Sequence, residues 1–544
     1  MRTAFILIAL SFVAFAAWTG YHDPDDLWPM TPASLLIGLG IYDLIQTRHA
    51  VWRNYPVIGH LRWLMEGLRP YVQQYFIEPD TGGMPINRMF RAIVYQRAKN
   101  ARDTLPYGTR VDTYRDGYEW MAHSLGAIEV TDVDPDLRVT IGGPQCRHPY
   151  RASVFNISAL SFGALSPTAI RALNLGARLR GFAHNTGEGG ISPYHLEGGD
   201  LIWQIGTGYF GCRDRHGNFD PARFRDQAQL PAVKMIELKL SQGAKPGHGG
   251  ILPAAKNTPE IARIRGVPPG IEIVSPAVHR TFDSPIGLLE FIARLRELSD
   301  GKPVGFKLAM GEPHEFVAIC QAMTLTGIYP DFVTVDGGEG GTGAAPLEYS
   351  NSVGMPLREA LALVVDCLEG YGLKRQVRVI ASGKILSAFH LVKHFAIGAD
   401  ACNSGRGMML ALGCIHSLSC NTNRCPTGVA TQNPALYRGL VVSDKARRVA
   451  NYHAKTLHAT TDLLTSAGLR HPCELTRAHV YRRIDQRQIR RYDEIFPPVA
   501  EGCLLAGDIP PHLAQAVGRA RPDRFLPNGK PSPPGFSHDS GKRR

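Results

Sequence analysis

From Val154 onward the chain repeats one pattern, in which a short apolar run is followed by a glycine-rich loop and then by a helix. Apolar strands that alternate with helices are typical of a parallel sheet. About eight such units over about 270 residues predict a closed barrel, with a doubly wound open sheet as the alternative. We therefore expect an α/β protein built on a (β/α)8 TIM-type barrel, with an N-terminal transmembrane hairpin and a helical lead-in. The expected strands are Val154–Ser158, Val233–Leu238, Ile271–Ser275, Val304–Leu308, Phe332–Asp336, Val377–Ala381 and Asp400–Asn403.

The last two expected strands are each followed by a short loop that combines serine, glycine and one basic residue. These loops are Ser382-Gly383-Lys384 and Ser404-Gly405-Arg406. In such barrels the active site lies at the carboxyl ends of the strands, and phosphate is often held after the last two of them. Glycine lets backbone N–H groups approach an anion closely. Both loops are therefore expected to bind a phosphate group; the alternative is that their glycines simply turn the chain.

Lys307 is a charged residue within the apolar run Val304–Leu308. A buried charge is costly unless it is paired with a partner. The part of a flavin ring that becomes negative on reduction is a suitable partner. We therefore expect Lys307 to contact a flavin, with a lysine at the exposed end of a strand as the alternative.

The run Asp336–Gly343 contains the spacing G-x-G-x-x-G. The same spacing marks dinucleotide-binding folds, but there an acidic residue ends the second strand, and this region has none. We expect the run to let the flavin ring lie close to the backbone. The expected contacts are Asp336, Gly338, Gly340 and Gly341.

Two more glycine-dense loops, Asn185–Gly190 and Gln242–Gly250, carry isolated ionisable residues. The first contains Glu188, and the second contains Lys245 and His248. Loops with few side chains to pack but with isolated charges are suited to contacting a substrate. Plain surface loops are the alternative.

Three cysteines, Cys414, Cys420 and Cys425, lie within twelve residues with the spacing C-x5-C-x4-C. Thiolates are the usual ligands of iron–sulfur clusters. Three of them indicate a [3Fe–4S] cluster, or a [4Fe–4S] cluster with a fourth ligand from elsewhere. A zinc site that includes His416 fits this spacing less well, and buried structural cysteines are the other alternative.

Two apolar runs, residues 4–18 and 32–45, precede the barrel and are separated by an acidic break. Each is short for a membrane span, which takes about 20 residues, but with their flanks they can form a helical hairpin. Basic residues at both outer ends predict that both ends face the cytoplasm. A cleaved signal peptide and packing of the runs on the barrel are the alternatives. The net charge of +12 agrees with an anionic membrane or an acidic redox partner, and no basic stripe with interleaved aromatic residues indicates nucleic acid.

Changes in composition divide the chain into five regions. The last of them is rich in Pro, Gly, Ser and Lys and has too few apolar residues for a packed core. The expected regions are a membrane anchor (1–50), a lead-in (51–150), the barrel with the iron–sulfur loop (151–465), a helical extension (466–521) and a disordered basic tail (522–544).

Together these loops resemble the FMN-binding synthase domain of glutamate synthase, over about residues 150–465. The resemblance implies an FMN-containing barrel with a [3Fe–4S] cluster on the three cysteines. It also implies that Ser161 contacts the cofactor. The motifs that carry the resemblance are SFGALSP at 161–167, NTGEGG at 185–190, QGAKPGHGG at 242–250, DGGEGGTGAAP at 336–346, and the cysteines followed by CPTGVATQ at 425–432.

In that family, the reduced flavin delivers a hydride to 2-iminoglutarate, formed from 2-oxoglutarate and ammonia, to give L-glutamate. Such enzymes are oxidoreductases acting on CH–NH2 donors, and their electrons arrive through the cluster from a pyridine-nucleotide-dependent subunit or a ferredoxin. The resemblance places Lys245 and Arg265 on the oxoacid, with His248 beside them and Glu188 near the flavin. Two basic groups suit two carboxylates. Glu188 and Lys245 are the expected catalytic residues.

The chain departs from the family pattern KPGEGGQ at two positions. It has His248 in place of the glutamate and Ile251 in place of the glutamine that contacts the substrate. Because an aliphatic side chain cannot hydrogen-bond an oxoacid, another substrate is the main alternative, and a membrane-tethered electron-transfer module without a substrate is a further one. No amidotransferase domain is recognised, so ammonia is expected to be free or supplied by a partner. The chain resembles a short, membrane-tethered form of the family whose catalytic domain faces the cytoplasm.

Overall fold

The computed structural model describes residues 1–526 and divides the chain into two compact units. The first unit is Met1–Arg88, and the second begins at Met89. This boundary differs from the expected ones after residues 50 and 150. Most of the expected basic tail, residues 527–544, lies outside the described residues.

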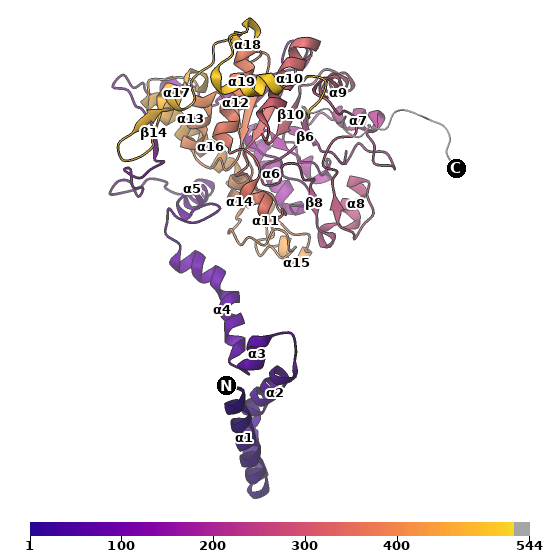
Figure 1. Ribbon diagram of the computed structural model, residues 1–544, viewed down its shortest axis with the longest axis vertical. Helices are drawn as coiled ribbons and strands as arrows, with labels where there is room; N and C mark the ends of the chain where they lie inside the picture. The colour runs from indigo at the N-terminus through magenta and orange to yellow at the C-terminus, as the bar shows by residue number, and fades with distance from the viewer. Residues whose placement is uncertain (527–544) are drawn as a thin grey trace, which may run out of the picture. The chain divides into compact units, whose positions relative to one another are not determined.

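The first unit begins with a helical hairpin made of α1 (Arg2–His22) and α2 (Thr31–Ile45), joined by the 3-10 helix η1 (Pro24–Met30) (Figure 1). The two helices approach closely at Gly40, where a Cβ atom would collide with the ring of Phe5. By length and composition, α1 is long and apolar enough to cross a membrane. At 15 residues, α2 is shorter than the roughly 20 that a perpendicular span takes.

A polar corner links the hairpin to the rest of the first unit, which comprises α3 (Ala50–Asn54), α4 (Gly59–Val72) and the π-helical turn η2 (Gln73–Ile77). The buried carboxylate of Asp43 accepts hydrogen bonds from the backbone N–H of Val57 and from Nε2 of His60, each at 2.8 Å. On the other helix, Nε of Arg2 donates to the carbonyl of Arg53 at 2.6 Å. These bonds fix both ends of the hairpin at the same corner.

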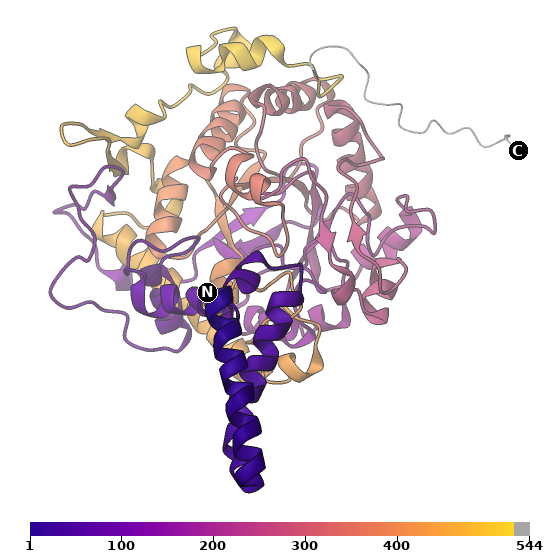
Figure 2. The same ribbon diagram turned by 60° about the horizontal axis from the view of Figure 1, so that its bottom comes forward.

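The second unit is a closed barrel of eight parallel strands that follow one another in chain order, as the sequence predicts. Figure 2 shows the strands inside a ring of helices. The strands are β4 (Phe155–Ile157), β5 (His184–Asn185), β6 (Leu201–Ile205), β7 (Val233–Lys239), β10 (Val304–Leu308), β11 (Phe332–Asp336), β12 (Arg378–Ser382) and β13 (Ala401–Ser404).

The ring of helices follows from clear start and stop signals in the sequence. The first barrel helix, α6 (Pro167–Arg180), begins after Ser166, whose Oγ accepts from the N–H of Ala169 at 3.2 Å, and is capped at its C-terminus by Gly181 with φ of 62°. The long helix α16 (Val442–Ser466) packs against it. The other large helices are α7 (Pro221–Ala228), α9 (Pro285–Leu298), α10 (Pro313–Thr326), α12 (Leu357–Gly370), α13 (Ala388–Ile397) and α16 (Val442–Ser466).

The amino end of the barrel is closed by an antiparallel hairpin, β2 (Arg138–Ile141) and β3 (Tyr150–Ser153). Ile141 and Ala152 of this hairpin pack on the apolar side chains with which the barrel strands begin. The interior is therefore a packed core at this end, and only the carboxyl end is left to form a site. The barrel residues of this core are Ala183, Ile202, Met235, Phe332, Ile380 and Ala401.

Three parts of the expected secondary structure need correction. Ile271–Ser275 is not a barrel strand, because only β9 (Ile273–Val274) is extended and it pairs antiparallel with β8 (Ile251–Leu252). The barrel strands β5 and β6 were not expected, because the connection between them holds only the 3-10 turn η4 (Pro193–His195) and no α-helix.

The third correction concerns residues 466–521, which were expected to be helical. They contain β14 (Val480–Arg483) and β15 (Ile489–Arg491) besides short helices, and β14 pairs with β1 (Glu119–Met121). The strands were overlooked because more than half of their residues are basic, and because β14 is mostly half-buried while β15 is exposed, so no apolar pattern marks them.

Candidate active site

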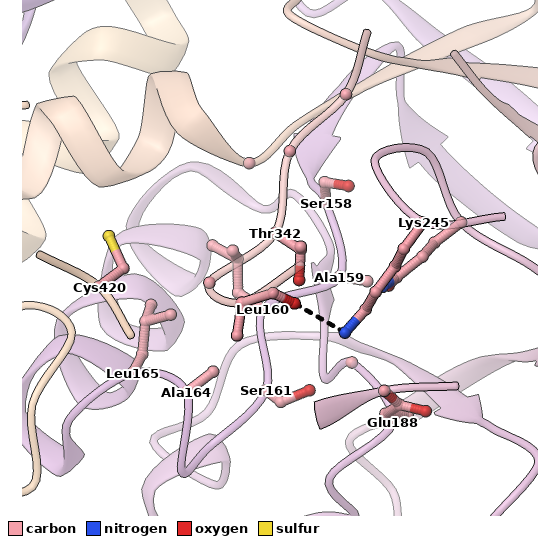
Figure 3. Close-up of a pocket in the computed structure, with 18 of the residues that line it drawn as sticks. Ser158, Ala159, Leu160, Ser161, Ala164, Leu165, Glu188, Lys245, Thr342 and Cys420 are labelled. Carbon is pink, nitrogen blue, oxygen red and sulfur yellow. Dashed lines mark hydrogen bonds between the residues drawn. The ribbon is translucent and has the colours of Figure 1, made fainter. Parts of the chain in front are cut away.

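A cavity opens at the carboxyl ends of the barrel strands, and residues in or just after all eight strands line it. In the close-up, Lys245 and Glu188 lie at one side and Cys420 at the other, with Ser161 and Thr342 between them (Figure 3). Fourteen of the residues expected to bind substrate, cofactor or metal line this cavity. They are Ser161, Glu188, Lys245, Arg265, Lys307, Asp336, Gly340, Gly341, Ser382, Gly383, Lys384, Gly405, Arg406 and Cys420.

Glu188 forms a buried ion pair with Lys239, the last residue of β7, at 3.0 Å. Burial raises the pKa of Glu188, but Lys239, Arg265 and Lys245 lower it by more, so the net pKa is lowered. The loop that follows β7 brings Gly250 so close that a Cβ atom there would collide with the Glu188 carboxylate. Glu188 is therefore a fixed, ionised carboxylate in the cavity wall.

Lys245 and Arg265 are buried cations that make no ion pair within the described residues. Nζ of Lys245 donates to the carbonyl of Ala344 at 2.8 Å, and burial, with a smaller effect of Lys239, lowers its pKa to about 8. Nη2 of Arg265 donates to the carbonyl of Phe162 at 3.1 Å, while its buried Nε has no partner among the described residues. Burial lowers the pKa of Arg265 to about 10. Buried cations without counter-ions are costly, which favours an anionic ligand between them.

Lys307, at the carboxyl end of β10, pairs with Asp336 at the end of β11 at 3.1 Å. Asp336 also accepts the backbone N–H of Gly243 at 2.8 Å. The pair thus holds Lys307 at the cavity floor, where the sequence predicts it, with its charge already balanced by a carboxylate.

The two loops expected to hold phosphate meet at one end of the cavity. Oγ of Ser382 lies 3.2 Å from Oγ of Ser158, which follows β4. Gly383 has a φ of 149° and Lys384 a φ of 49°, so both are in the left-handed region. Burial and the nearby Arg406 lower the pKa of Lys384, and Glu339 opposes them only in part, so the net pKa is lowered. Two cations that repel each other beside exposed glycine backbone form a suitable cradle for a phosphate.

Arg406 begins α14 (Arg406–Leu412), and its Nη2 donates to the carbonyl of Thr342 at 3.0 Å. A Cβ atom on Gly341 would collide with the Arg406 guanidinium. Glycine at position 341 therefore leaves room for the Arg406 side chain beside the cradle. The expected contact of this run with a flavin ring stays a prediction.

The loop that carries the three cysteines has three non-glycine residues in the left-handed region, His416 at 62°, Leu418 at 56° and Asn423 at 61°. Non-glycine residues adopt such conformations infrequently, and they cluster in active-site and ligand-binding loops. Nη1 of Arg91, in α5 (Arg88–Ala98), lies 2.8 Å from Nδ1 of His416 and braces the loop from outside.

Two of the three cysteines have environments that act on the thiolate in opposite directions. Burial raises the pKa of Cys425, but its net pKa is lowered by hydrogen bonds from the Thr427 hydroxyl and from backbone N–H groups that follow it. Burial, with smaller effects of Cys420 and Cys425, raises the pKa of Cys414 to about 11. Within residues 1–526, however, no three His, Cys, Asp or Glu side chains are arranged so that they could hold a metal ion. The cysteine ligand set therefore stays a prediction.

Comparison with known proteins identifies the family. Residues 110–470 match the family model described as the conserved region in glutamate synthase. The glutamate synthase large subunit-like protein YerD of Bacillus subtilis is 37% identical over 504 residues, which cover 86% of this chain and 96% of YerD. The chain belongs to the glutamate synthase family. It is therefore an oxidoreductase of the class that acts on CH–NH2 donors.

Other members of the glutamate synthase family align over a shorter part of the chain. An archaeal glutamate synthase [NADPH] of Methanocaldococcus jannaschii is 36% identical over 315 residues, 58% of each chain. The glutamate synthase [NADPH] large chain of Bacillus subtilis is 32% identical over 289 residues, which are 52% of this chain but 18% of its own length. The chain thus spans nearly all of YerD but little more than half of the archaeal enzyme.

Five of the expected site residues do not line the cavity. His248 lies outside it, with its ring 5.5 Å from that of Tyr349. Gly338 packs against backbone, and Ser404 is buried beneath the cradle, where its Oγ donates to the carbonyl of Ile385 at 2.6 Å. The remaining two are Cys414 and Cys425.

Among the cavity residues that the sequence did not lead us to expect, three carry long polar side chains. Lys239 could have been recognised by the argument used for Lys307, since it is a charge at the end of an apolar strand. Gln204 lies on β6, a strand that was not expected. Lys256 lies in a short 3-10 turn and gives no sequence signal; its Nζ donates to the carbonyls of Ala164 and Ala430, each at 2.9 Å.

Proposed function

We propose that this protein is an FMN-dependent glutamate synthase that reduces 2-iminoglutarate, formed from 2-oxoglutarate and ammonia, to L-glutamate. One observation carries the proposal: a single cavity joins a two-cation cradle, Lys384 and Arg406, to two further buried cations, Lys245 and Arg265. The first pair suits a phosphate and the second a dicarboxylate. Family membership supports both assignments.

The cradle residues fit FMN. Ser382, Gly383 and Gly405 leave backbone and hydroxyl groups open to the phosphate, and Lys384 and Arg406 balance its charge. Lys307 would lie against the ring, with Asp336 holding it in place. When bound and reduced, FMN would supply the hydride for the imine carbon.

The substrate is oriented by residues on the other side of the cavity. Lys245 and Arg265 bind its two carboxylates, which fixes the imine carbon relative to the ring position. Glu188, held ionised by Lys239, stabilises the positive charge of a protonated imine. Because a protonated imine accepts a hydride without a further proton, Glu188 serves as a carboxylate and not as a general acid.

Electrons are proposed to enter through a [3Fe–4S] cluster on Cys414, Cys420 and Cys425, from a pyridine-nucleotide-dependent subunit or a ferredoxin. The lowered pKa of Cys425 and the shaped loop support a thiolate ligand set. Cys420→Ser is expected to reduce bound iron to background while FMN binding is retained. Unchanged iron content, measured after anaerobic reconstitution, would remove Cys420 from the ligand set.

The protein is further proposed to be anchored in the cytoplasmic membrane through its N-terminal hairpin, with the barrel on the cytoplasmic side. The apolar α1 and the basic residues at the open end of the hairpin support this orientation.

The test of the proposed function is a single-turnover experiment. Anaerobically reduced, FMN-loaded protein is mixed with 2-oxoglutarate and ammonium, and flavin absorbance and L-glutamate are followed. We expect flavin reoxidation together with L-glutamate formation, and neither in a Lys245→Ala variant. A fully reduced, FMN-loaded protein that forms no L-glutamate would overturn the proposal.

A second candidate is an oxidoreductase with the same cofactors that acts on another oxoacid. Ile251 favours it, because this residue lines the cavity where the family pattern has a glutamine. Oxoacids with aliphatic side chains, added in place of 2-oxoglutarate, separate the candidates: faster reoxidation by one of them would favour the second.

A further inference from the structure

Glu237 is a buried carboxylate that the proposed function leaves without a role. It lies on β7 between Met235, which belongs to the apolar core, and Lys239, which lines the cavity. Because side chains on a strand alternate, these three residues face the barrel interior. Glu237 therefore lies one layer below the cavity, and its relative exposure is 0%.

The carboxylate of Glu237 is held by neutral donors alone. Oε1 accepts from Nε2 of Gln204 at 2.6 Å and from Nδ2 of Asn185 at 2.8 Å, and Oε2 accepts from Oγ1 of Thr334 at 2.6 Å. Within the described residues, no lysine, arginine or histidine forms an ion pair with it. Burying a carboxylate without a cation is costly, so a role beyond filling the core is expected.

The consequence of these bonds is a fixed orientation for two amides. Gln204 and Asn185 both donate through their amide nitrogens to Oε1 of Glu237, so the NH2 group of each amide points at Glu237. The oxygen of each amide then points away from it. For Asn185 this oxygen accepts the backbone N–H of Gly187 at 3.0 Å, which shapes the turn just before Glu188.

For Gln204 the consequence reaches the cavity. Gln204 is part of the cavity lining, and its Oε1 makes no hydrogen bond within residues 1–526. A free acceptor at this position suits a ligand that presents an N–H group. The isoalloxazine ring of a flavin carries one such group, an imide N–H between two carbonyls.

We propose that Glu237 is a positioning residue that locks the Gln204 amide with its oxygen toward the cavity, where it accepts the imide N–H of the flavin ring. This inference rests on the proposed FMN site but not on the identity of the oxoacid. Thr334 donates to the other carboxylate oxygen and makes no hydrogen bond with Gln204 within residues 1–526, so it provides a matched control.

The test measures FMN binding to protein depleted of FMN. In Glu237→Gln the new amide cannot accept from both neighbouring NH2 groups and Thr334 as before, so the Gln204 amide is no longer locked. We expect FMN affinity to fall roughly tenfold, as for the loss of one buried hydrogen bond with a mismatched donor. Gln204→Met removes the acceptor at similar volume, and we expect it to lower FMN affinity by the same factor. Thr334→Val is expected to lower FMN affinity by less than about twofold.

An exchange of the two groups separates positioning from simple packing. In the double variant Glu237→Gln/Gln204→Glu, the amide at 237 donates inward to the carboxylate at 204, whose second oxygen faces the cavity. We expect this variant to recover FMN affinity to within about threefold of the wild type. A folded Glu237→Gln or Gln204→Met protein with wild-type affinity would overturn the proposal, and so would a loss that the exchange does not recover.

The outcome is distinguishable from failure of the proposed function. If the wild-type protein binds no FMN, the proposed function fails and this inference fails with it. If the wild type binds FMN and the variants bind it equally well, only the role of Glu237 is refuted.

Discussion

The two units of this protein distribute apolar and charged residues in opposite ways. In the N-terminal hairpin, apolar side chains face outward, and Leu7 and Leu35 are 61% and 71% exposed. In the barrel, cations face inward, and Lys245 and Arg265 are only 1% and 5% exposed. Apolar side chains exposed to water are unfavourable, and so are buried cations that lack a counter-charge.

The difference indicates what each unit contacts. An outward apolar helix that is long enough to span a bilayer suits lipid. Inward cations without matching carboxylates suit an anionic ligand, because the ligand supplies the missing counter-charge. We therefore expect the surface of the hairpin to contact a membrane, and the cavity of the barrel to bind an anionic cofactor and an anionic substrate.

The largest expected effect concerns the hairpin. Leu10→Arg combined with Val13→Arg places two charges on exposed apolar positions near the middle of α1. Each charge is expected to cost about 2.5–3.5 kcal/mol at the centre of a membrane helix, so the protein should move from the membrane fraction to the soluble fraction. Leu125→Arg, on a fully exposed position of the second unit, is the control and should change nothing. An unchanged membrane fraction in the double variant would show that α1 is not the anchor.

The next largest effect concerns the cradle. Lys384→Ala combined with Arg406→Ala removes both cations beside the expected phosphate. Each hydrogen bond between charged groups contributes about 1.5–3 kcal/mol, so FMN affinity should fall by roughly two to four orders of magnitude. Arg375→Ala serves as the control, because its side chain is 80% exposed and pairs with Glu501. FMN titration of the depleted protein checks the prediction, and equal affinities in the two variants would contradict it.

A smaller effect is expected from pH. The pKa of Lys245 is about 8, so the side chain is positive below that pH and loses its charge as the pH rises through it. The KM for 2-oxoglutarate should be constant at neutral pH and rise above about pH 8. In Lys245→Arg the rise should disappear, because arginine keeps its charge. The same alkaline rise in both enzymes would assign it to another group.

The smallest effect concerns Ile251, which decides between the two candidate functions. Ile251→Gln restores the residue of the family pattern at the cavity wall. If 2-oxoglutarate is the natural substrate, the KM should change by no more than about fivefold, since one neutral hydrogen bond contributes about 1 kcal/mol. A large decrease in KM would indicate that the natural cavity is shaped for a less polar oxoacid. Val274→Gln, an exposed position on the neighbouring strand β9, is the control.

The sequence predicted the barrel because most of its units combine an apolar strand with a helix. Val304–Leu308 and Phe332–Asp336 coincide with β10 and β11. The strands β5 and β6 escaped prediction because no helix separates them, and Gln204 on β6 was lost with them. A pattern of apolar residues can be recognised only over several residues, so a barrel strand of two residues such as β5 leaves no such pattern.

Site residues were predictable where a charge interrupts an apolar strand or a glycine-rich loop, as for Lys307 and Glu188. Which loop residues turn into the cavity was not predictable, since it depends on packing between distant segments. His248 is the example: it is three residues from Lys245 but packs against Tyr349 outside the cavity. Glu237 could not be assigned a role from the sequence because its partners come from three other strands.

The most direct test of the central claim is the flavin content of the full-length protein, purified anaerobically with FMN supplied. The account predicts a yellow-brown protein that releases stoichiometric FMN on denaturation and loses it in Lys384→Ala/Arg406→Ala. A folded, colourless protein that binds no FMN would contradict the account.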